Sequence, residues 1–209
     1  NAVFGSQVAE TGLGKPVTRG LVYYRHPGGL LGLYDSEGFE TGTSGDEILA
    51  ALRSRVADSR SLPVDQQIHA AWYLVRWSDR RFEDRQGDFV RALAELGLPV
   101  ILVITQVPSR DGIPHPEAIE LAQYIESLGL PLRPAGRALL TNALEDPFTA
   151  SPVFGLQDLL DATYLVVPEV ATAALTAVQI LDWERKRQAV KTIINQSVAL
   201  AAGVGAAPI

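Results

Sequence analysis

The stretch "PVILVIT" at residues 99–105 decides the fold class of this chain. It is a continuous apolar run rich in β-branched side chains, without the alternation of a strand that has one face in water. Such runs are typical of strands buried on both faces of a parallel sheet. We therefore expect residues 99–105 to lie inside a parallel sheet that has helices on both sides.

The segments around this run alternate between strand and helix patterns. A mostly apolar strand is expected at 68–77, and helical spacing follows at 82–96 and again at 116–128. A further strand at 137–143 and a further helix at 156–167 complete the series. This alternation predicts an α/β fold with a mainly parallel sheet.

The N-terminal part predicts a β-hairpin and one more helix. Two strand patterns, at 21–26 and 30–35, are joined by the turn residues "PGG" at 27–29. We expect this hairpin to form an antiparallel edge of the sheet. Residues 46–58 have the apolar spacing of an amphipathic helix, with acidic residues at its start.

The character of the chain changes after Pro168. Residues 168–209 are alanine-rich and helical in pattern, so we place a domain boundary there, with one α/β domain at 1–167. Three interpretations of the second segment stay open: a helical bundle packed on the first domain, a membrane contact, or a dimerisation face. Residues 1–5 read as the last turn of a helix, and we expect the chain to be a fragment.

The composition excludes several classes of function. The chain has 209 residues, with 24 acidic and 18 basic side chains and no basic block, which argues against a dedicated DNA- or RNA-binding surface. It contains no cysteine and only three histidines, so disulfides and thiolate metal sites are excluded and a zinc cluster is not expected. These features fit a cytoplasmic protein.

Polar residues follow three of the predicted strands. The sequence "DSEG" follows the second hairpin strand at 35–38, Thr105-Gln106 end the strand at 99–105, and Thr141-Asn142 end the strand at 137–143. In parallel α/β sheets, ligands bind at the carboxyl ends of the strands. We therefore expect a binding site built from these residues.

The order of these segments resembles the Era-like branch of the Ras-like, P-loop GTPases of bacteria. "LLGLYDSEGFE" at 30–40 resembles their strand and second switch, and the loop at 6–20, with Thr18, resembles their first switch. "LGLPVILVITQVP" at 96–108 ends where their base-recognition motif belongs, and 168–209 resembles an alanine-rich helical domain often fused behind them. The resemblance implies a Ras-like three-layer sandwich followed by a C-terminal helical segment.

The resemblance also implies a ligand, which is GTP or GDP bound with Mg²⁺. Thr18 and Asp35 would serve the magnesium ion, Asp35 through a water molecule. The amide of Gly38 would donate to the γ-phosphate, whose loss would release both loops. The residues expected near the guanine base are Thr105, Gln106, Thr141 and Asn142.

Three departures limit what this resemblance implies. The phosphate-binding loop and the central strand before it would lie upstream of Asn1, so this fragment would have a gap in its sheet and would be inactive alone. Pro108 replaces the aspartate that pairs with guanine, and Asp111 is the nearest carboxylate that follows it. Phe39 replaces the glutamine that orients the attacking water in Ras-type enzymes, so hydrolysis is expected to be slow.

Three functions therefore remain open for the intact protein. The first is a GTP-binding protein that hydrolyses GTP as a molecular switch. The second is a degenerate GTPase used as a protein-interaction scaffold, which Pro108 and the pair Ser36-Glu37 favour. The third is a membrane-associated adaptor. The expected partners are a guanine nucleotide, a protein partner or second copy, and a peripheral membrane contact through the C-terminal helices, with no DNA.

Overall fold

The apolar run forms β4 (Val100–Thr105), the central strand of a three-stranded parallel sheet. β4 pairs in parallel with β3 (Ala71–Arg76) on one side and with β7 (Ala138–Leu140) on the other. The first five residues of β4 are each at most 1% exposed. The prediction of a buried parallel strand is confirmed, since both of its edges carry a partner strand.

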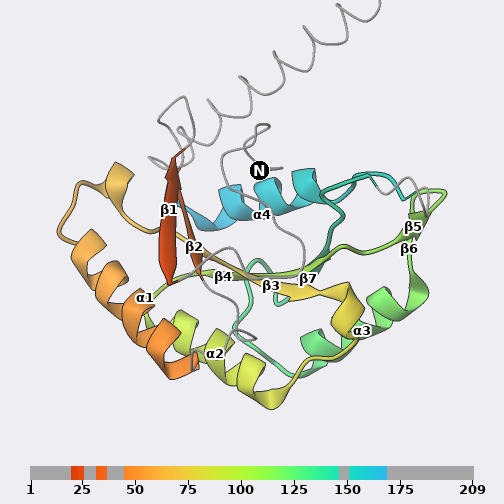
Figure 1. Ribbon diagram of the computed structural model, residues 1–209, viewed down its shortest axis with the longest axis horizontal. Coiled ribbons are helices and arrows are strands. Elements are labelled where there is room, and N and C mark those ends of the chain that lie inside the picture. Colours follow the sequence, from red (N-terminus) through yellow and green to blue (C-terminus); the bar gives the residue numbers. More distant parts are fainter. Residues whose placement is uncertain (1–19, 26–31, 37–44, 146–150, 169–209) are drawn as a thin grey trace, which may run out of the picture.

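The computed structural model describes residues 20–25, 32–36, 45–145 and 151–168. These residues form three layers, with the parallel sheet in the middle, three helices on one face and one helix on the other (Figure 1). The prediction of an α/β fold with helices on both faces of a parallel sheet is therefore confirmed. The helices are α1 (Gly45–Ser59), α2 (Asp84–Glu95) and α3 (Pro116–Ser127) on one face, and α4 (Leu156–Val166) on the other.

Alternate residues of β4 enter two separate hydrophobic cores. Val100, Leu102 and Ile104 belong to the larger core, which includes buried residues of α1, α2 and α3. Ile101 and Val103 belong to a smaller core with α4. Since successive side chains of a strand point to opposite faces, one strand holds both helical layers against the sheet.

The four helices lie close to their predicted ranges, because their apolar periodicity is a local property of the sequence. α3 shows the local signals clearly. His115 caps its N-terminus, with the backbone N–H of Glu117 donating to His115 Nδ1 at 3.3 Å, and Pro116 occupies the first turn.

Two strands are shorter than predicted. The strand expected at 68–77 ends at Arg76, because residues 77–79 form a short 3₁₀ helix, η3 (Trp77–Asp79), closed by Arg80 in the left-handed region with φ of 50°. The strand expected at 137–143 ends at Leu140. Beyond it, Asn142 exchanges backbone hydrogen bonds with Phe154 rather than with the neighbouring strand.

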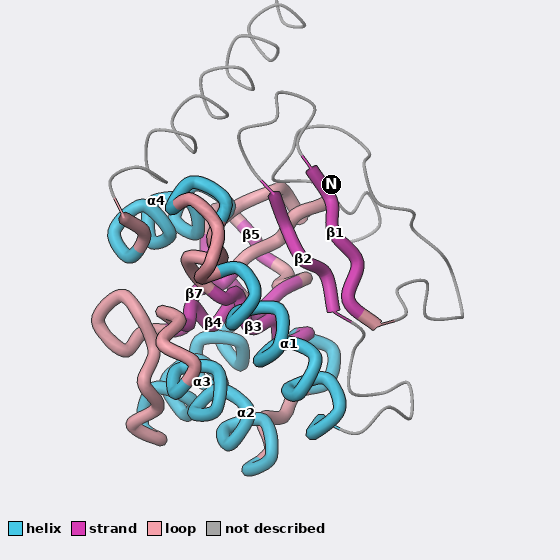
Figure 2. The backbone as a smooth tube through the Cα atoms, turned by 90° about the vertical axis from the view of Figure 1, so that its left-hand side faces the viewer, coloured by secondary structure: helices cyan, strands magenta, loops and turns pink. Residues whose placement is uncertain are grey.

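The predicted hairpin forms from β1 (Leu21–Arg25) and β2 (Gly32–Ser36), which pair antiparallel with Leu21 opposite Ser36. It is a separate two-stranded sheet, so the expectation that it forms an edge of the parallel sheet is wrong for the described residues. Its strands run across the direction of the parallel strands (Figures 1 and 2). The physical reason is that no described strand lies between β2 and β3 to link the two sheets by backbone hydrogen bonds.

Among the described strands, β3 is therefore an edge strand of the parallel sheet. The N–H of Ala71 donates to Pro99 at the start of β4, so Ala71, Tyr73 and Val75 direct their backbone groups toward β4. The backbone N–H and C=O groups of Trp72 and Leu74 point in the opposite direction, away from β4. The side chain of Leu74 is 58% exposed, an unusual position for a leucine in a parallel strand.

A second, very short hairpin follows β4. It consists of β5 (Ser109–Arg110) and β6 (Ile113–Pro114), joined by Asp111 and Gly112 with φ values of 54° and 77°. Two consecutive left-handed residues define the turn that Asp-Gly pairs favour. We did not predict this hairpin, although the Asp-Gly pair is a recognised signal for it.

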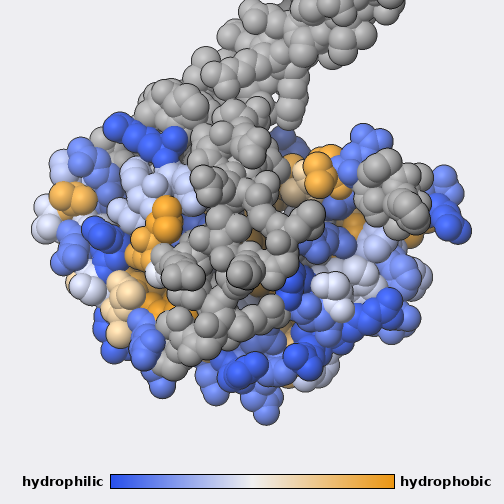
Figure 3. Space-filling view, viewed as in Figure 1, coloured by the Kyte–Doolittle hydropathy of each residue, from blue (hydrophilic) through white to orange (hydrophobic). Residues whose placement is uncertain are grey.

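No helix of the described residues is long and apolar enough to span a lipid bilayer. Where it is coloured, the face in Figure 3 is mostly hydrophilic, with small separate hydrophobic areas. The alanine-rich segment at 169–209, for which a membrane contact was one interpretation, lies outside the described residues.

The glycine before α4 is predicted to resist substitution. Gly155 has φ of 75°, and a Cβ at this position would collide with the carbonyl group of Leu140. Gly129 has φ of 62° but open space around it, so Gly129→Ala should cost roughly 1 kcal/mol of unfolding free energy. Gly155→Ala should cost about 2 kcal/mol more, because backbone must also move. Urea denaturation measures the free energy of unfolding of both variants. Equal losses would contradict the close contact between Gly155 and the carbonyl group of Leu140.

Alkaline pH should destabilise the fold through Tyr73. Burial raises the pKa of Tyr73 to about 12 from its ordinary 10.0. The pKa of Tyr73 is higher in the folded state than in the unfolded state. The free energy of unfolding therefore keeps its full value below pH 10 and falls as the pH rises toward 12. The loss should reach roughly 2 kcal/mol and should be absent in Tyr73→Phe. Urea denaturation across this pH range measures it, with Tyr124→Phe, at an exposed tyrosine of α3, as the matched control.

Candidate functional site

Five of the seven predicted site residues lie in the described structure. Thr18 and Gly38 lie outside it. Asp35 is in β2, whereas the other four lie at the carboxyl ends of β4 and β7, namely Thr105, Gln106, Thr141 and Asn142. The structure therefore brings four of the predicted residues into one cluster.

The end of β4 turns sharply at Gln106. Thr105 is the last strand residue, and its Oγ1 donates to the carbonyl of Val75 at 3.4 Å. Gln106 is exposed and has φ of 59°, a conformation that non-glycine residues rarely adopt. This turn directs Val107 back into the core, where its N–H donates to the carbonyl of Thr141 at 3.1 Å. Thr141 is thus bonded to Ile104 and Val107, the two residues that flank the pair Thr105-Gln106.

Thr141 and Asn142 are buried, with relative exposures of 2% and 7%. Thr141 Oγ1 donates to the carbonyl of Ile104 at 3.4 Å. Asn142 Nδ2 donates to the carbonyl of Pro152 at 2.9 Å, which ties the end of β7 to the segment before α4. Both side chains therefore hold the framework of the cluster, and a ligand would meet backbone groups and the exposed Gln106 first.

A buried serine pair, which sequence reasoning missed, lies beside this cluster. The backbone N–H of Ser109 donates to Ser151 Oγ at 3.4 Å, and both residues are buried. The hydroxyl of Ser109 has no hydrogen-bond partner within the described part of the chain. Nothing in the local pattern around either serine indicates this pairing, because the two residues are 42 positions apart.

Asp111 does not take the place of Pro108 in the described structure. The carbonyl of Pro108 accepts a hydrogen bond from the N–H of His115 at 2.9 Å, which closes the base of the β5–β6 hairpin. Asp111 lies at the exposed turn of that hairpin. The first aspartate after β4 is therefore at the turn of this hairpin and not beside Gln106.

Asp35 lies apart from the cluster. It is exposed, sits opposite Val22 in the hairpin register, and is followed by Ser36 at the end of β2. The ring of the preceding residue, Tyr34, lies 4.7 Å from the ring of Tyr23 between centroids, tilted by 41°. Figure 1 shows the hairpin on the left of the parallel sheet, whereas β4 ends toward β5 on the right. The two halves of the predicted site are thus separate in this structure.

The described residues contain no group of three histidine, aspartate or glutamate side chains that could hold a metal ion. An exposed carboxylate such as Asp35 has the oxygen chemistry that suits Mg²⁺ through a bridging water. One carboxylate does not make a magnesium site. The described site residues therefore offer Mg²⁺ one contact, from the carboxylate of Asp35 through a water molecule.

Sequence comparisons add no family to this picture. No protein-family model matches the chain, and no curated protein gives a significant match.

Replacing the framework asparagine should cost stability. Asn142→Ala removes the donor to Pro152 and leaves a carbonyl without its hydrogen bond, so we expect a loss of about 1–3 kcal/mol in the free energy of unfolding. Gln106→Ala, at the exposed neighbour with the left-handed backbone, should change it by less than about 0.5 kcal/mol. Urea denaturation of both variants checks this difference. Equal small changes would mean that the asparagine does not support the loop.

Proposed function

We propose that the intact protein is a guanine-nucleotide-binding switch that binds GTP with Mg²⁺ and hydrolyses it slowly. Polar residues gather at the carboxyl ends of β4 and β7, where ligands of parallel α/β sheets bind. The chain order of hairpin, helix and parallel βα units matches the order that the resemblance requires.

The observation that carries this proposal is that, among the described residues, β3 has a partner strand on one side only and the hairpin forms a separate sheet. No described strand pairs with the other edge of β3, and Leu74 of β3 is 58% exposed. A parallel strand that paired with both β3 and β2 would make one continuous sheet. It would also give Asp35 and the β4–β7 cluster a common edge. This is the position in which the resemblance expects the strand that precedes the phosphate-binding loop.

In this proposal the residues of the chain have separate tasks. Thr18 and Gly38 contact the γ-phosphate end of the nucleotide, and Asp35 fixes a magnesium-bound water. Gln106, exposed at the end of β4, contacts the base together with backbone groups that Thr141 and Asn142 hold in place. The bound magnesium ion would neutralise phosphate charge.

A second candidate, a degenerate GTPase used as a protein-interaction scaffold, is favoured by a specific observation. Pro108 provides no carboxylate, and Asp111 is held at the turn of the β5–β6 hairpin. A scaffold would keep the fold but bind nucleotide weakly or without preference for guanine.

Titration calorimetry on the full-length protein with GTP, GDP and ATP in the presence of Mg²⁺ separates these candidates. The switch requires tighter binding of GTP and GDP than of ATP. Equal weak heats for all three nucleotides would refute the switch and favour the scaffold.

The role of Asp35 is tested in the same experiment. Asp35→Ala should weaken Mg²⁺-dependent GTP binding by about tenfold, or roughly 1.4 kcal/mol, and should weaken GDP binding less, because the carboxylate serves the ion that bridges the terminal phosphates. Asp58→Ala, at an exposed aspartate of α1, is the matched control and should change neither affinity. Unchanged GTP affinity in Asp35→Ala would remove this residue from the site.

A further inference from the structure

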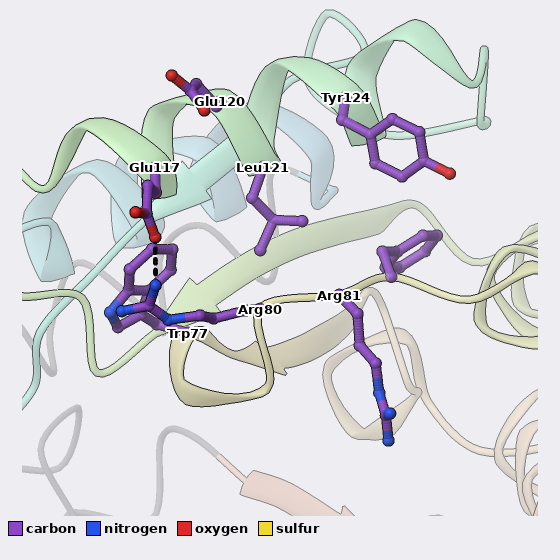
Figure 4. Close-up of a pocket in the computed structure, with 8 residues that line it drawn as sticks. Trp77, Arg80, Arg81, Glu117, Glu120, Leu121 and Tyr124 are labelled. Carbon is purple, nitrogen blue, oxygen red and sulfur yellow. Dashed lines mark hydrogen bonds and ion pairs between the residues drawn. The ribbon is translucent and has the colours of Figure 1, made fainter.

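A groove of about 460 Å³ lies between α3 and the segment that follows β3. Figure 4 shows its two walls. Leu121 and Tyr124 of α3 extend toward the segment that carries Arg80 and Arg81. This groove is separate from the cluster at the ends of β4 and β7 and is not used by the proposed function.

The centre of the groove is fixed in place by a chain of contacts. The ring of Trp77 lies 5.1 Å from the ring of His115, and the guanidinium of Arg80 lies over Trp77 at 4.9 Å from its centroid. Arg80 also forms an ion pair with Glu117 across the groove (Figure 4). Since these two charges neutralise each other, the middle of the surface is preorganised and carries no net charge.

Charges of opposite sign flank this neutral centre. Glu120 of α3 is exposed and points away from the groove on one side, and Arg81 is 72% exposed and points away on the other side (Figure 4). Between them lie apolar surfaces of Leu121 and Tyr124, and Tyr124 is 48% exposed. The surface thus has an acidic side, an apolar and neutral strip, and a basic side.

We propose that this surface, defined by Arg80, Arg81, Glu120, Leu121 and Tyr124, is the contact of a homodimer. A twofold axis that runs along the groove places the acidic side of one copy opposite the basic side of the other. The contact is then self-complementary, as a twofold dimer requires. Arg81 of each copy faces Glu120 of the second copy, and the apolar strips meet between the two ion pairs.

An ion pair between Arg81 and Glu120 of a second copy disrupts little that the single chain already forms. Arg81 pairs with Glu83 at 3.2 Å, and a pair that exposed contributes little to stability. Glu120 has no ion pair among the described residues, so a cation from a second copy gives it a partner that the protomer does not. The apolar strip is small, so we expect a weak, concentration-dependent dimer that salt dissociates.

The test measures self-association by analytical ultracentrifugation at increasing concentration, up to the millimolar range. The wild-type chain should form dimers. Arg81→Glu leaves acidic groups on both sides of the groove, and Glu120→Arg leaves basic groups on both sides, so each should weaken dimerisation by at least roughly tenfold. The double variant, Arg81→Glu with Glu120→Arg, should restore it, because the two signs are merely exchanged.

A mixture of the two single variants gives an independent measurement. Because one variant is acidic on both sides and the other basic on both sides, they should associate with each other more tightly than either does with itself. Glu95→Arg, at an exposed glutamate of α2, is the matched charge control and should leave the wild-type dimer intact. Circular dichroism of each variant verifies that the fold is retained.

Several outcomes would overturn the proposal. These are a wild-type chain that stays monomeric over the whole concentration range, a double variant that does not regain the dimer, and single variants that do not associate when mixed. A dimer that forms but responds equally to Glu95→Arg would also overturn it, since the contact would then lie elsewhere.

Discussion

The burial of β4 between two helical layers is the interaction on which the rest of the structure depends. Its side chains alternate between the core of α1, α2 and α3 and the core of α4, so a single strand links both faces of the sheet. Because β4 turns at Gln106 and Val107 re-enters the core, the polar ends of β4 and β7 meet on one side of the sheet.

Much of this arrangement could be predicted from the sequence, because the signals are local. The apolar run at 99–105 predicted the central strand, and helical patterns in the sequence predicted the four helices. The Asp111-Gly112 pair carried a hairpin signal of the same local kind that we did not use. Strand ends were less predictable. A 3₁₀ helix closed by Arg80 follows β3, and β7 ends before Asn142, which pairs with Phe154.

The candidate site was predictable in part for a related reason. That polar residues follow parallel strands is visible in the sequence, and in the structure Thr141 forms backbone hydrogen bonds with Ile104 and Val107, on either side of Thr105-Gln106. The sequence could not indicate that the Asn142 side chain donates to the carbonyl of Pro152, or that the N–H of Ser109 donates to Ser151 Oγ. Both hydrogen bonds depend on how the segment before α4 folds back. The groove beside Trp77 was equally hidden, since it requires Arg80 and Glu117 to meet across 37 residues of chain.

The bridge between Asn142 and Phe154 has a mechanical consequence. Phe154 is followed by Gly155, whose carbonyl accepts the N–H of Leu159 in the first turn of α4. The end of β7 and the start of α4 are thus coupled within a few residues, at a glycine that has no room for a side chain. A displacement of the end of β7 would therefore be passed through Phe154 and Gly155 to the first turn of α4.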